Sequence, residues 1–517
     1  MLNIGTSIAG RIVLLLAGLY VRRLLISCVG NEVNGLNALY GSIIGLLSVA
    51  ELGVGSAIVF SMYRPIVDGD QRKVAALYSL YRRLYRMIGA VIFGAGIALM
   101  PFLPKLIKDY DTLDINVYAT FLLTLVSVVI SYLYSAKTSL IEAHKNNYIT
   151  TGIVTIARMM RYALQIASLL IWGSYTIFLV CQIIETVIIW IMTEKVVDRL
   201  YPDMIRMDEK LDGGTIREVA KNVKAMFMHK IGAILVGAVD SMVISAFVGV
   251  MILGKYSNYG AIAAAMTGII SLFFTPLTSV IGHLCASGSP EEIKKEFDHF
   301  YTLNYVLGLV FFLGYYAVID NVIMLFFGPG LGLSRVITYI MTLNGFVSYM
   351  RFSPLLFRDA SGTFWNDRWK PVAEGMINLV LSVLFVKLFP EEYSVAGVIA
   401  ATIVTILLIC DIVEPHIIFK YVFKVPARGF YVMNYSGIAL FACCLLVMEK
   451  LRVTDLPDAV QLLINGMISL ALSAAVLLLL GMLDRKFANE CRVIISQAGG
   501  WVRDRCSRRS NKDNRNK

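Results

Sequence analysis

"LLLAGLYVRRLLISCVG", residues 14–30, is apolar enough to form most of a helix across a lipid bilayer, yet it contains two arginines. Arg22 and Arg23 are flanked by valine and leucine, and Arg11 lies eleven residues before Arg22. A charged side chain inside a bilayer is costly, so such residues usually face protein or a water-filled cavity. This stretch therefore predicts a membrane helix that presents positive charge to something other than lipid.

The rest of the chain repeats this apolar pattern. Of its 517 residues, 57% are hydrophobic and 16% are charged, which is below the roughly one quarter typical of soluble domains. Apolar runs of about 20 residues recur along nearly the whole length, and we expect an all-α polytopic membrane protein of fourteen spans. The expected spans are 4–28, 36–61, 87–107, 115–136, 150–172, 174–196, 228–250, 256–282, 301–327, 334–356, 372–389, 395–418, 430–448 and 460–482.

The N-terminus and the cysteines indicate which processing and which stabilising groups to expect in this membrane protein. The start "MLNIGTSIAG" lacks the basic region of a signal peptide, so we expect an uncleaved first helix. None of the eight cysteines forms a spaced pair in an outside loop, and no Cys/His cluster has zinc spacing. We therefore expect no disulfide framework, no metal and no cofactor.

Lysine and arginine are distributed unevenly between alternate loops. The loops on one side and the C-terminal tail carry most of them, and the opposite loops carry only Lys105, Lys108, Lys255, Arg335, Lys387, Lys450 and Arg452. The basic side is expected to be cytoplasmic, which places both termini inside. The net charge of +11 is spread over many short loops, so it indicates topology and contact with anionic lipids rather than a nucleic-acid partner.

The two halves of the chain align without a gap at a shift of 219 residues. Arg11 then falls on Lys230, Gly30 on Gly249 and Gly35 on Gly254. Both halves begin on the same side, so the repeat is parallel and predicts a two-lobed transporter architecture. We expect a six-helix lobe at 1–200, a cytoplasmic linker with an amphipathic helix at 201–227, a six-helix lobe at 228–425, two helices at 426–483 and a basic tail at 484–517.

Several stretches resemble one transporter superfamily in order and spacing. They are "LLSVAELGVGSAIVFSM" (46–62), "NNYITTGIVTIARMM" (146–160), "VDSMVISAFVGVMILGKYSNYGAI" (239–262), "PVAEGMINLVLSVLFVKLF" (371–389) and "VAGVIAATIVTILL" (395–408). Over roughly residues 1–425 the chain resembles the multidrug/oligosaccharidyl-lipid/polysaccharide (MOP) exporter superfamily, in particular its polysaccharide repeat-unit (O-antigen or capsule) flippases.

This resemblance implies a task without covalent chemistry. Such a flippase moves an oligosaccharide linked to undecaprenyl pyrophosphate from the inner to the outer leaflet by alternating access. It would lie in the bacterial plasma membrane as a monomer, in contact with membrane lipids and with other polysaccharide-assembly membrane proteins.

Cations inside the spans are the candidates for substrate binding. Arg11 and Arg22 lie within about 20° of each other on one helix face, and Arg158 and Arg161 share a face of the fifth span. Arginine suits phosphate oxygens because its planar fork can donate two hydrogen bonds. The candidate residues are Arg11, Arg22, Lys230, Arg158, Arg161 and Arg351. The alternative is that they form structural ion pairs, Arg11 and Arg22 with Glu51 or Asp240, or extend to the membrane surface.

Acids inside the spans have two interpretations. A buried carboxylate can carry a proton or bind sodium, and it can also serve as the counter-ion of an arginine. The candidates are Glu51, Glu185, Asp240, Asp411 and Glu414.

Three other functions remain open. A flippase for lipid II, the peptidoglycan precursor, would share the span count and the cationic site. A cation-coupled multidrug antiporter of the same superfamily would favour twelve spans and a site dominated by carboxylates. A membrane glycosyltransferase or polymerase would need a large loop with clustered acids or a nucleotide-sugar domain, and neither is evident.

Overall fold

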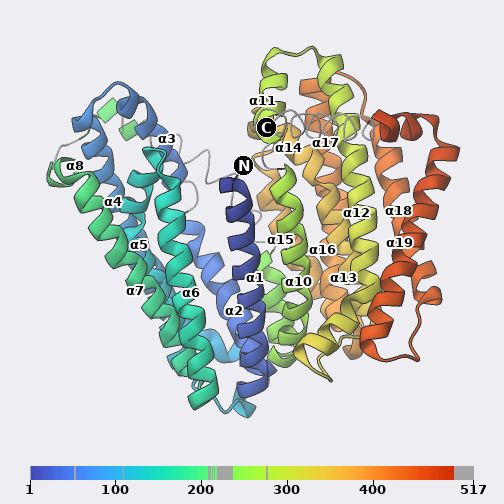
Figure 1. Ribbon diagram of the computed structural model, residues 1–517, viewed down its shortest axis with the longest axis horizontal. Helices are drawn as coiled ribbons and strands as arrows, with labels where there is room; N and C mark the ends of the chain where they lie inside the picture. The colour runs from blue at the N-terminus through green and yellow to red at the C-terminus, as the bar shows by residue number, and fades with distance from the viewer. Residues whose placement is uncertain are drawn as a thin grey trace, which may run out of the picture. The chain divides into compact units, whose positions relative to one another are not determined.

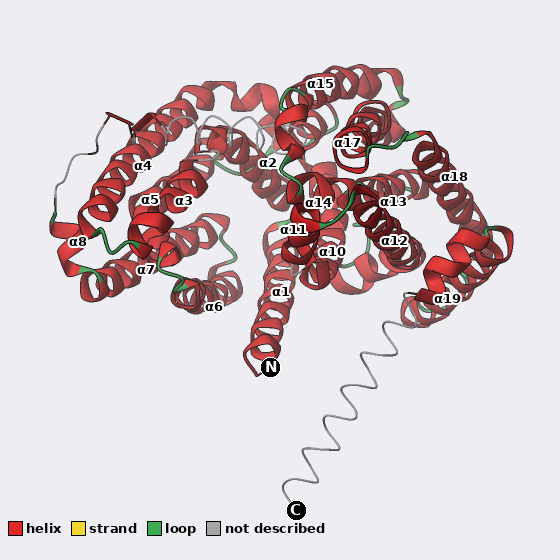
Figure 2. Ribbon diagram, turned by 90° about the horizontal axis from the view of Figure 1, so that it is seen from above, coloured by secondary structure: helices red, strands yellow, loops and turns green. Residues whose placement is uncertain are grey.

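The computed structural model of this chain describes residues 2–51, 54–108, 110–207, 237–274 and 277–493, together with 211, 213–214 and 216–217. Every regular element in these ranges is a helix, as Figure 2 shows. The expected all-α fold is therefore confirmed. Most of the amphipathic helix expected in the 201–227 linker, the start of the 228–250 span (228–236) and the end of the basic tail lie outside the described residues.

The helices follow the order of the expected spans (Figure 1). The first part of the chain forms α1 (Leu2–Val29), α2 (Asn31–Leu47), α3 (Val54–Val67), α4 (Gln71–Leu99), α5 (Val117–Ala143), α6 (Asn147–Trp172), α7 (Tyr175–Leu200) and α8 (Pro202–Arg206). The second part forms α10 (Val250–Phe274), α11 (Leu277–Ser287), α12 (Pro290–Phe327), α13 (Arg335–Met350), α14 (Phe352–Ala360), α15 (Lys370–Leu388), α16 (Ser394–Thr405), α17 (Asp411–Ile418), α18 (Arg428–Leu451) and α19 (Asp458–Leu483).

Nine helical segments of the described ranges are long and apolar enough to cross a membrane. They are Gln71–Leu106, Val117–Ala143, Asn147–Trp172, Tyr175–Leu200, Pro290–Phe327, Lys370–Leu388, Glu391–Phe423, Arg428–Leu451 and Asp458–Leu483. Two other expected spans are interrupted. A 3₁₀ turn at Ser48–Glu51 follows α2 and precedes α3, and α13 ends just before Arg351.

The chain forms two compact units. Unit 1 comprises residues 1–260 and 368–401, and unit 2 comprises residues 261–367 and 402–517. These units do not coincide with the lobes expected from the sequence repeat, because 368–401 joins the first unit and α10 runs past the end of its 1–260 part. The lobe boundaries at 200 and 425 stay a prediction.

The 219-residue repeat is visible in the helix boundaries. Helices α2 and α10 begin at residues 31 and 250, α4 and α12 at 71 and 290, and α7 and α16 at 175 and 394, each pair exactly one repeat apart. The residues before α4 and α12, Asp70 and Ser289, both cap their helix by accepting a hydrogen bond from a backbone amide three residues later. Similar local signals therefore start equivalent helices.

Glycines mark the repeat where helices turn and cross. Gly30 and Gly249 precede α2 and α10 with φ of 119° and 121°, a conformation that side chains rarely adopt. A Cβ on Gly35 would lie 1.9 Å from the carbonyl oxygen of Val250, and one on Gly254 would lie 2.4 Å from that of Asn31. Helices α2 and α10 therefore cross at equivalent glycines within unit 1.

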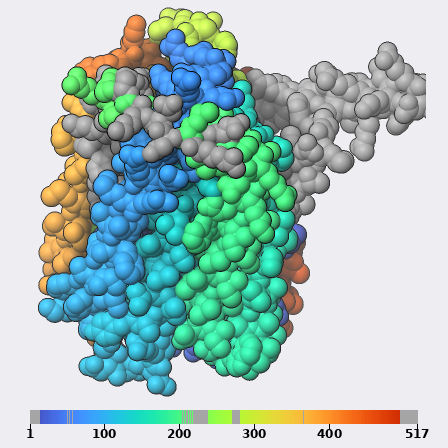
Figure 3. All heavy atoms as spheres, turned by 90° about the vertical axis from the view of Figure 1, so that its left-hand side faces the viewer, coloured from blue at the N-terminus to red at the C-terminus, as the bar shows by residue number. Residues whose placement is uncertain are grey.

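In unit 1, helices α4, α5, α6 and α7 pack side by side, and α1 contacts α6 (Figure 1). Helices α4 and α7 cover much of the face of this unit that Figure 3 shows. Apolar side chains on these helices, such as Val91 and Ile191, are exposed, as expected for helices surrounded by lipid.

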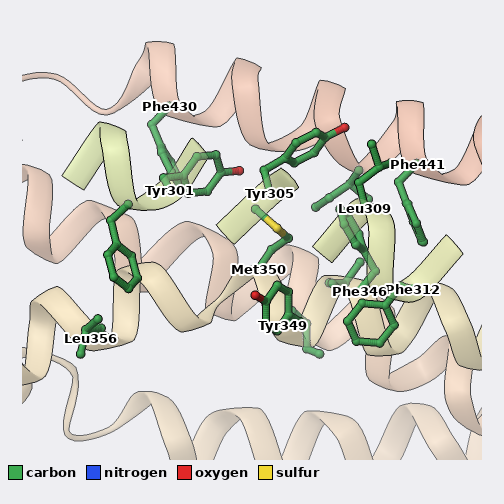
Figure 4. Packing of buried hydrophobic residues seen from close by; sticks show 14 of the residues in the cluster. Tyr301, Tyr305, Leu309, Phe312, Phe346, Tyr349, Met350, Leu356, Phe430 and Phe441 are labelled. Carbon is green, nitrogen blue, oxygen red and sulfur yellow. The ribbon is translucent and has the colours of Figure 1, made fainter. Parts of the chain in front are cut away.

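Unit 2 has an aromatic core along α12. Tyr301, Tyr305 and Phe312 of this helix are buried against aromatic side chains of α13 and α18 (Figure 4). The closest pair joins α13 and α18, where the rings of Phe346 and Phe441 stack with centroids 3.9 Å apart. This packing holds α18 against the rest of the unit.

Candidate functional site

Arg22 of α1 is held by neutral side chains of α10. Its Nε donates to Oδ1 of Asn258 at 2.8 Å, and its Nη2 donates to Oγ of Ser257. Neither partner carries charge, and no carboxylate of the described residues contacts this guanidinium. The alternative ion pair with Glu51 is not formed, because Glu51 accepts a hydrogen bond from Tyr85 instead. The positive charge of Arg22 is therefore oriented without being neutralised.

Buried asparagines orient the side-chain amide of Asn258, which accepts a hydrogen bond from Arg22. Nδ2 of Asn34, on α2, donates to the same Oδ1 of Asn258 at 3.0 Å and to the carbonyl oxygen of Gly254 at 3.0 Å. Asn31 binds the carbonyl oxygen of Met251 at 2.8 Å, and all three asparagines are at most 4% exposed. These hydrogen bonds surround the point where α2 and α10 cross at Gly35 and Gly254. They hold the side-chain amide of Asn258 in the orientation that faces Arg22.

Arg158 and Arg161 of α6 share one acid. Nε of Arg158 lies 3.4 Å from Oε1 of Glu185 on α7, and Nη1 of Arg161 lies 3.0 Å from Oε2. The predicted face-sharing of these arginines is confirmed, and Glu185 is their counter-ion. One carboxylate serves two guanidinium groups, so the cluster keeps a net positive charge. Nε of Arg161 is buried without a hydrogen-bond partner in the described structure.

Arg22 and Arg161 line one cavity of about 200 Å³ between α1, α2, α6 and α7. We call it the cationic pocket. Its other lining residues are Gly18, Val21, Leu25, Asn34, Asn37, Tyr162, Gln165, Phe178 and Gln182. The described lining contains two cations, four amide side chains and no carboxylate. A cavity of this composition favours an anion, and arginine favours phosphate or carboxylate oxygens.

The amides of the cationic pocket were missed at the sequence level. Gln165 lies four residues after Arg161 on α6, and Gln182 lies three residues before Glu185 on α7. Spacings of three and four place polar residues on one helix face, so these two stripes could have been recognised. Asn34 and Asn37 follow the same spacing on α2.

In unit 2, the predicted binding residue Arg351 is paired. Its Nη2 lies 2.7 Å from Oε1 of Glu414, whose side chain is fully buried. Asp411 accepts a hydrogen bond from Asn434 at 3.1 Å, and Asn434 accepts one from Tyr301 at 2.7 Å. Glu414 therefore acts as a counter-ion and Asp411 as part of a polar network in this unit.

The predicted cations that the structure describes are divided between the two compact units. Arg22, Arg158 and Arg161 lie in unit 1, and Arg351 lies in unit 2. The side chain of Arg11 and the whole of Lys230 lie outside the described residues, so their predicted equal depth stays a prediction. Asp240 is buried in unit 1 at 7% exposure.

This chain resembles known proteins in structure but matches none of the compared families or curated proteins in sequence. No family model matches the chain, and no curated protein matches it by sequence. The lipid II flippase MurJ in an inward closed conformation matches 91% of this chain and 98% of its own, at a TM-score of 0.62 and 15% identity. An inward-facing multidrug resistance MATE family transporter of the MOP superfamily matches 82% of this chain and 95% of its own, at a TM-score of 0.59 and 12% identity. The chain therefore has the fold of MOP-superfamily transporters.

Proposed function

We propose that this protein is a flippase that moves a lipid-linked oligosaccharide, joined to its polyprenyl carrier through pyrophosphate, from the inner to the outer leaflet of a bacterial plasma membrane. The observation that carries the proposal is the cationic pocket. Arg22 is held by neutral groups inside a unit whose fold is that of transporters. Arg22 is half-buried without a counter-ion, which is costly in a membrane protein, and an anionic ligand would supply the missing charge.

The chemistry of the pocket suits pyrophosphate more than a sugar acid alone. Arg22 and Arg161 each present a guanidinium, and the amides of Asn37 and Gln182 can donate further hydrogen bonds. A pyrophosphate has several oxygens around two phosphorus atoms and can contact both arginines at once. Binding, orientation and release are all that transport requires of these residues, because no covalent bond changes.

We further propose that both termini lie in the cytoplasm. This orientation rests on the lysine and arginine bias of the loops. It places the start of α1 and α4 at the inner surface, so the cationic pocket would lie along the path from the inner to the outer leaflet. Alternating access would open the pocket to each side in turn.

A lipid II flippase is the second candidate. Its substrate also carries pyrophosphate on a polyprenyl lipid, so the cationic pocket would serve it equally. The fold match to MurJ favours this candidate. A multidrug antiporter has a fold match as well, but a cationic pocket would repel an organic cation.

A transport assay with three substrates separates these functions. The full chain is reconstituted in liposomes, and appearance in the opposite leaflet is followed for a polyprenyl-pyrophosphate oligosaccharide, for lipid II and for a fluorescent organic cation. The proposal expects movement of the oligosaccharide carrier above the rate of empty liposomes. Movement of lipid II alone would establish the second candidate, and movement of the organic cation alone would exclude both flippase functions.

A further inference from the structure

A second cavity in unit 1 has a different chemical character. It has a volume of about 660 Å³, within the roughly 300–1,000 Å³ typical of small-molecule sites. Helices α3, α4 and α5 form it together with the end of the 3₁₀ turn at Glu51. The lining residues are Glu51, Gly55, Val59, Phe60, Tyr63, Tyr81, Tyr85, Tyr134, Ser135, Thr138, Ser139 and Glu142. We call it the tyrosine cavity.

Hydroxyl groups dominate this lining. In the described lining, four tyrosines, two serines and one threonine contribute seven hydroxyls, beside two carboxylates and no lysine or arginine. A hydroxyl both donates and accepts hydrogen bonds, whereas a carboxylate only accepts. Such a wall matches a ligand that is itself rich in hydroxyls. An organic cation would use the carboxylates and the ring faces, but it would not use the acceptor lone pairs that these hydroxyls keep after donating within the protein.

The hydroxyls are held in place by one another. Ser139 donates to the hydroxyl of Tyr81 at 2.9 Å, and Tyr85 donates to Oε1 of Glu51 at 2.8 Å. The rings of Tyr81 and Tyr85 meet edge to face with centroids 4.3 Å apart, and both residues are at most 2% exposed. Two buried phenols thus present their polar ends to the cavity in a fixed orientation.

Gly55 makes room for these polar ends. A Cβ at this position would lie 2.8 Å from the hydroxyl oxygen of Tyr81 and 2.8 Å from that of Tyr85. Toward the outside, Phe60 and Tyr63 of α3 are 67% and 43% exposed. The cavity therefore has aromatic groups at an accessible edge and a polar interior, as sites for pyranose rings require: apolar ring faces to stack on and hydroxyls to hydrogen-bond.

We infer that the tyrosine cavity is a sugar subsite that binds a pyranose ring of the transported glycan, while the cationic pocket binds the pyrophosphate. This inference rests on the proposed function and adds to it a site for the glycan. The two cavities belong to the same compact unit, and their described linings have no residue in common. Binding of the pyrophosphate and binding of the sugar would therefore contribute separately to the affinity for the substrate. The carboxylates of Glu51 and Glu142 accept from sugar hydroxyls, and the tyrosine hydroxyls supply the reciprocal bonds.

Binding to the purified full chain in lipid nanodiscs tests the division. The probes are a polyprenyl pyrophosphate without sugar and the same carrier with one hexose attached, titrated by calorimetry. The wild type is expected to bind the hexose-bearing probe about tenfold more tightly, because two or three hydrogen bonds are added. Tyr85→Phe and Glu142→Gln should each remove most of this difference and leave affinity for the bare carrier unchanged.

A matched control lies beside the cavity. The ring of Tyr132 is 5.8 Å from that of Tyr85, but its hydroxyl binds Ser48 at 3.3 Å and it does not line the cavity. Tyr132→Phe should therefore keep the tenfold preference. Thermal unfolding of each variant confirms that the fold is retained, and Ser139→Ala provides a third lining variant, which removes one hydroxyl oxygen.

The outcomes distinguish the two proposals. Equal affinity of the wild type for both probes would overturn the sugar subsite and leave the pyrophosphate site intact. Failure of both probes to bind would overturn the proposed function itself. A sugar preference that persists in Tyr85→Phe and Glu142→Gln would place the glycan elsewhere. Binding of a fluorescent organic cation that depends on Glu142, without any sugar preference, would assign the cavity to cations and also overturn the inference.

Discussion

Arg22 shows how a charge can be kept inside a membrane protein without an opposite charge. Its two donors meet Asn258 and Ser257, and Asn34 binds the same amide oxygen. Hydrogen bonds to a charged group are worth more than those between neutral groups, about 1.5–3 kcal/mol each, so neutral acceptors can hold the side chain in place. These neutral acceptors do not cancel the positive charge of Arg22, so the guanidinium can still attract an anion.

Glu185 offers a contrasting test at this scale. Glu185→Gln removes the charge that Arg158 and Arg161 share, so we expect lower stability and a more positive cationic pocket. Breaking such a buried pair costs about 3–5 kcal/mol, an upper value here because Arg158 is partly exposed. The expected result is a lower melting temperature together with tighter binding of inorganic pyrophosphate.

Arg158→Gln is the control for that change. It leaves Arg161 paired with Glu185 and removes the more exposed partner, so its melting temperature should stay close to that of the wild type. Weaker pyrophosphate binding in Glu185→Gln would contradict the view that Glu185 only offsets charge.

The sequence predicted the charged members of the site better than the neutral ones. Arg22 and Arg161 stand out because charge inside an apolar run is rare. Asn34, Gln165 and Gln182 do not stand out individually, because an amide in a membrane span is less costly and its partners are distant in the chain. The pairing of Arg351 with Glu414 joins residues 63 positions apart, which one sequence cannot reveal.

At the scale of helices, apolar run length and capping residues predict most boundaries. The expected division between the 150–172 and 174–196 spans is found where Gly173 adopts a left-handed conformation with φ of 57° between α6 and α7. The breaks inside the second and tenth spans were not predicted as separate helices. There apolar residues continue on both sides of Glu51 and Arg351, so hydropathy averaged over a window does not register the change in backbone conformation at these residues.

The α2–α10 crossing makes a prediction about the glycines. Gly35→Ala would place a Cβ against the backbone of Val250, and neither backbone can move without separating the helices. We expect a loss of about 1–3 kcal/mol in stability, in line with overpacking in other tightly packed sites. Thermal unfolding in detergent measures it.

Gly41→Ala is the matched control on the same helix. No atom lies within 4 Å of a Cβ at Gly41, so alanine should be neutral or slightly stabilising there. Equal melting temperatures for Gly35→Ala and Gly41→Ala would show that the crossing is looser than described.

At the scale of the whole molecule, the 219-residue repeat predicts where equivalent helices begin, and the charge bias of the loops predicts the orientation in the membrane. The 219-residue register reappears in the starts of α2 and α10, α4 and α12, and α7 and α16, because equivalent caps and glycines begin equivalent helices. The division into compact units was not predictable from it. That division depends on contacts of residues 368–401, which lie far along the chain from the rest of unit 1.

Orientation in the membrane is a separate prediction. With both termini inside, the loop around Gly69 is cytoplasmic and the loop around Asp114 is outside. In a variant without the native cysteines, a cysteine at position 114 should react with an impermeant maleimide in intact cells, and one at position 69 should react only after lysis. The reverse pattern would invert the whole topology.

The central claim is that Arg22 binds the pyrophosphate of the transported lipid. The most direct measurement is the rate at which a labelled polyprenyl-pyrophosphate oligosaccharide reaches the outer leaflet of liposomes that contain equal amounts of Arg22→Ala, Arg22→Lys or Arg64→Ala protein. Arg64 is the control, because its side chain is 93% exposed. We predict a loss of about tenfold or more for alanine, an intermediate rate for lysine, which keeps the charge without the planar fork, and the wild-type rate for Arg64→Ala. Transport by Arg22→Ala at the wild-type rate would contradict the claim.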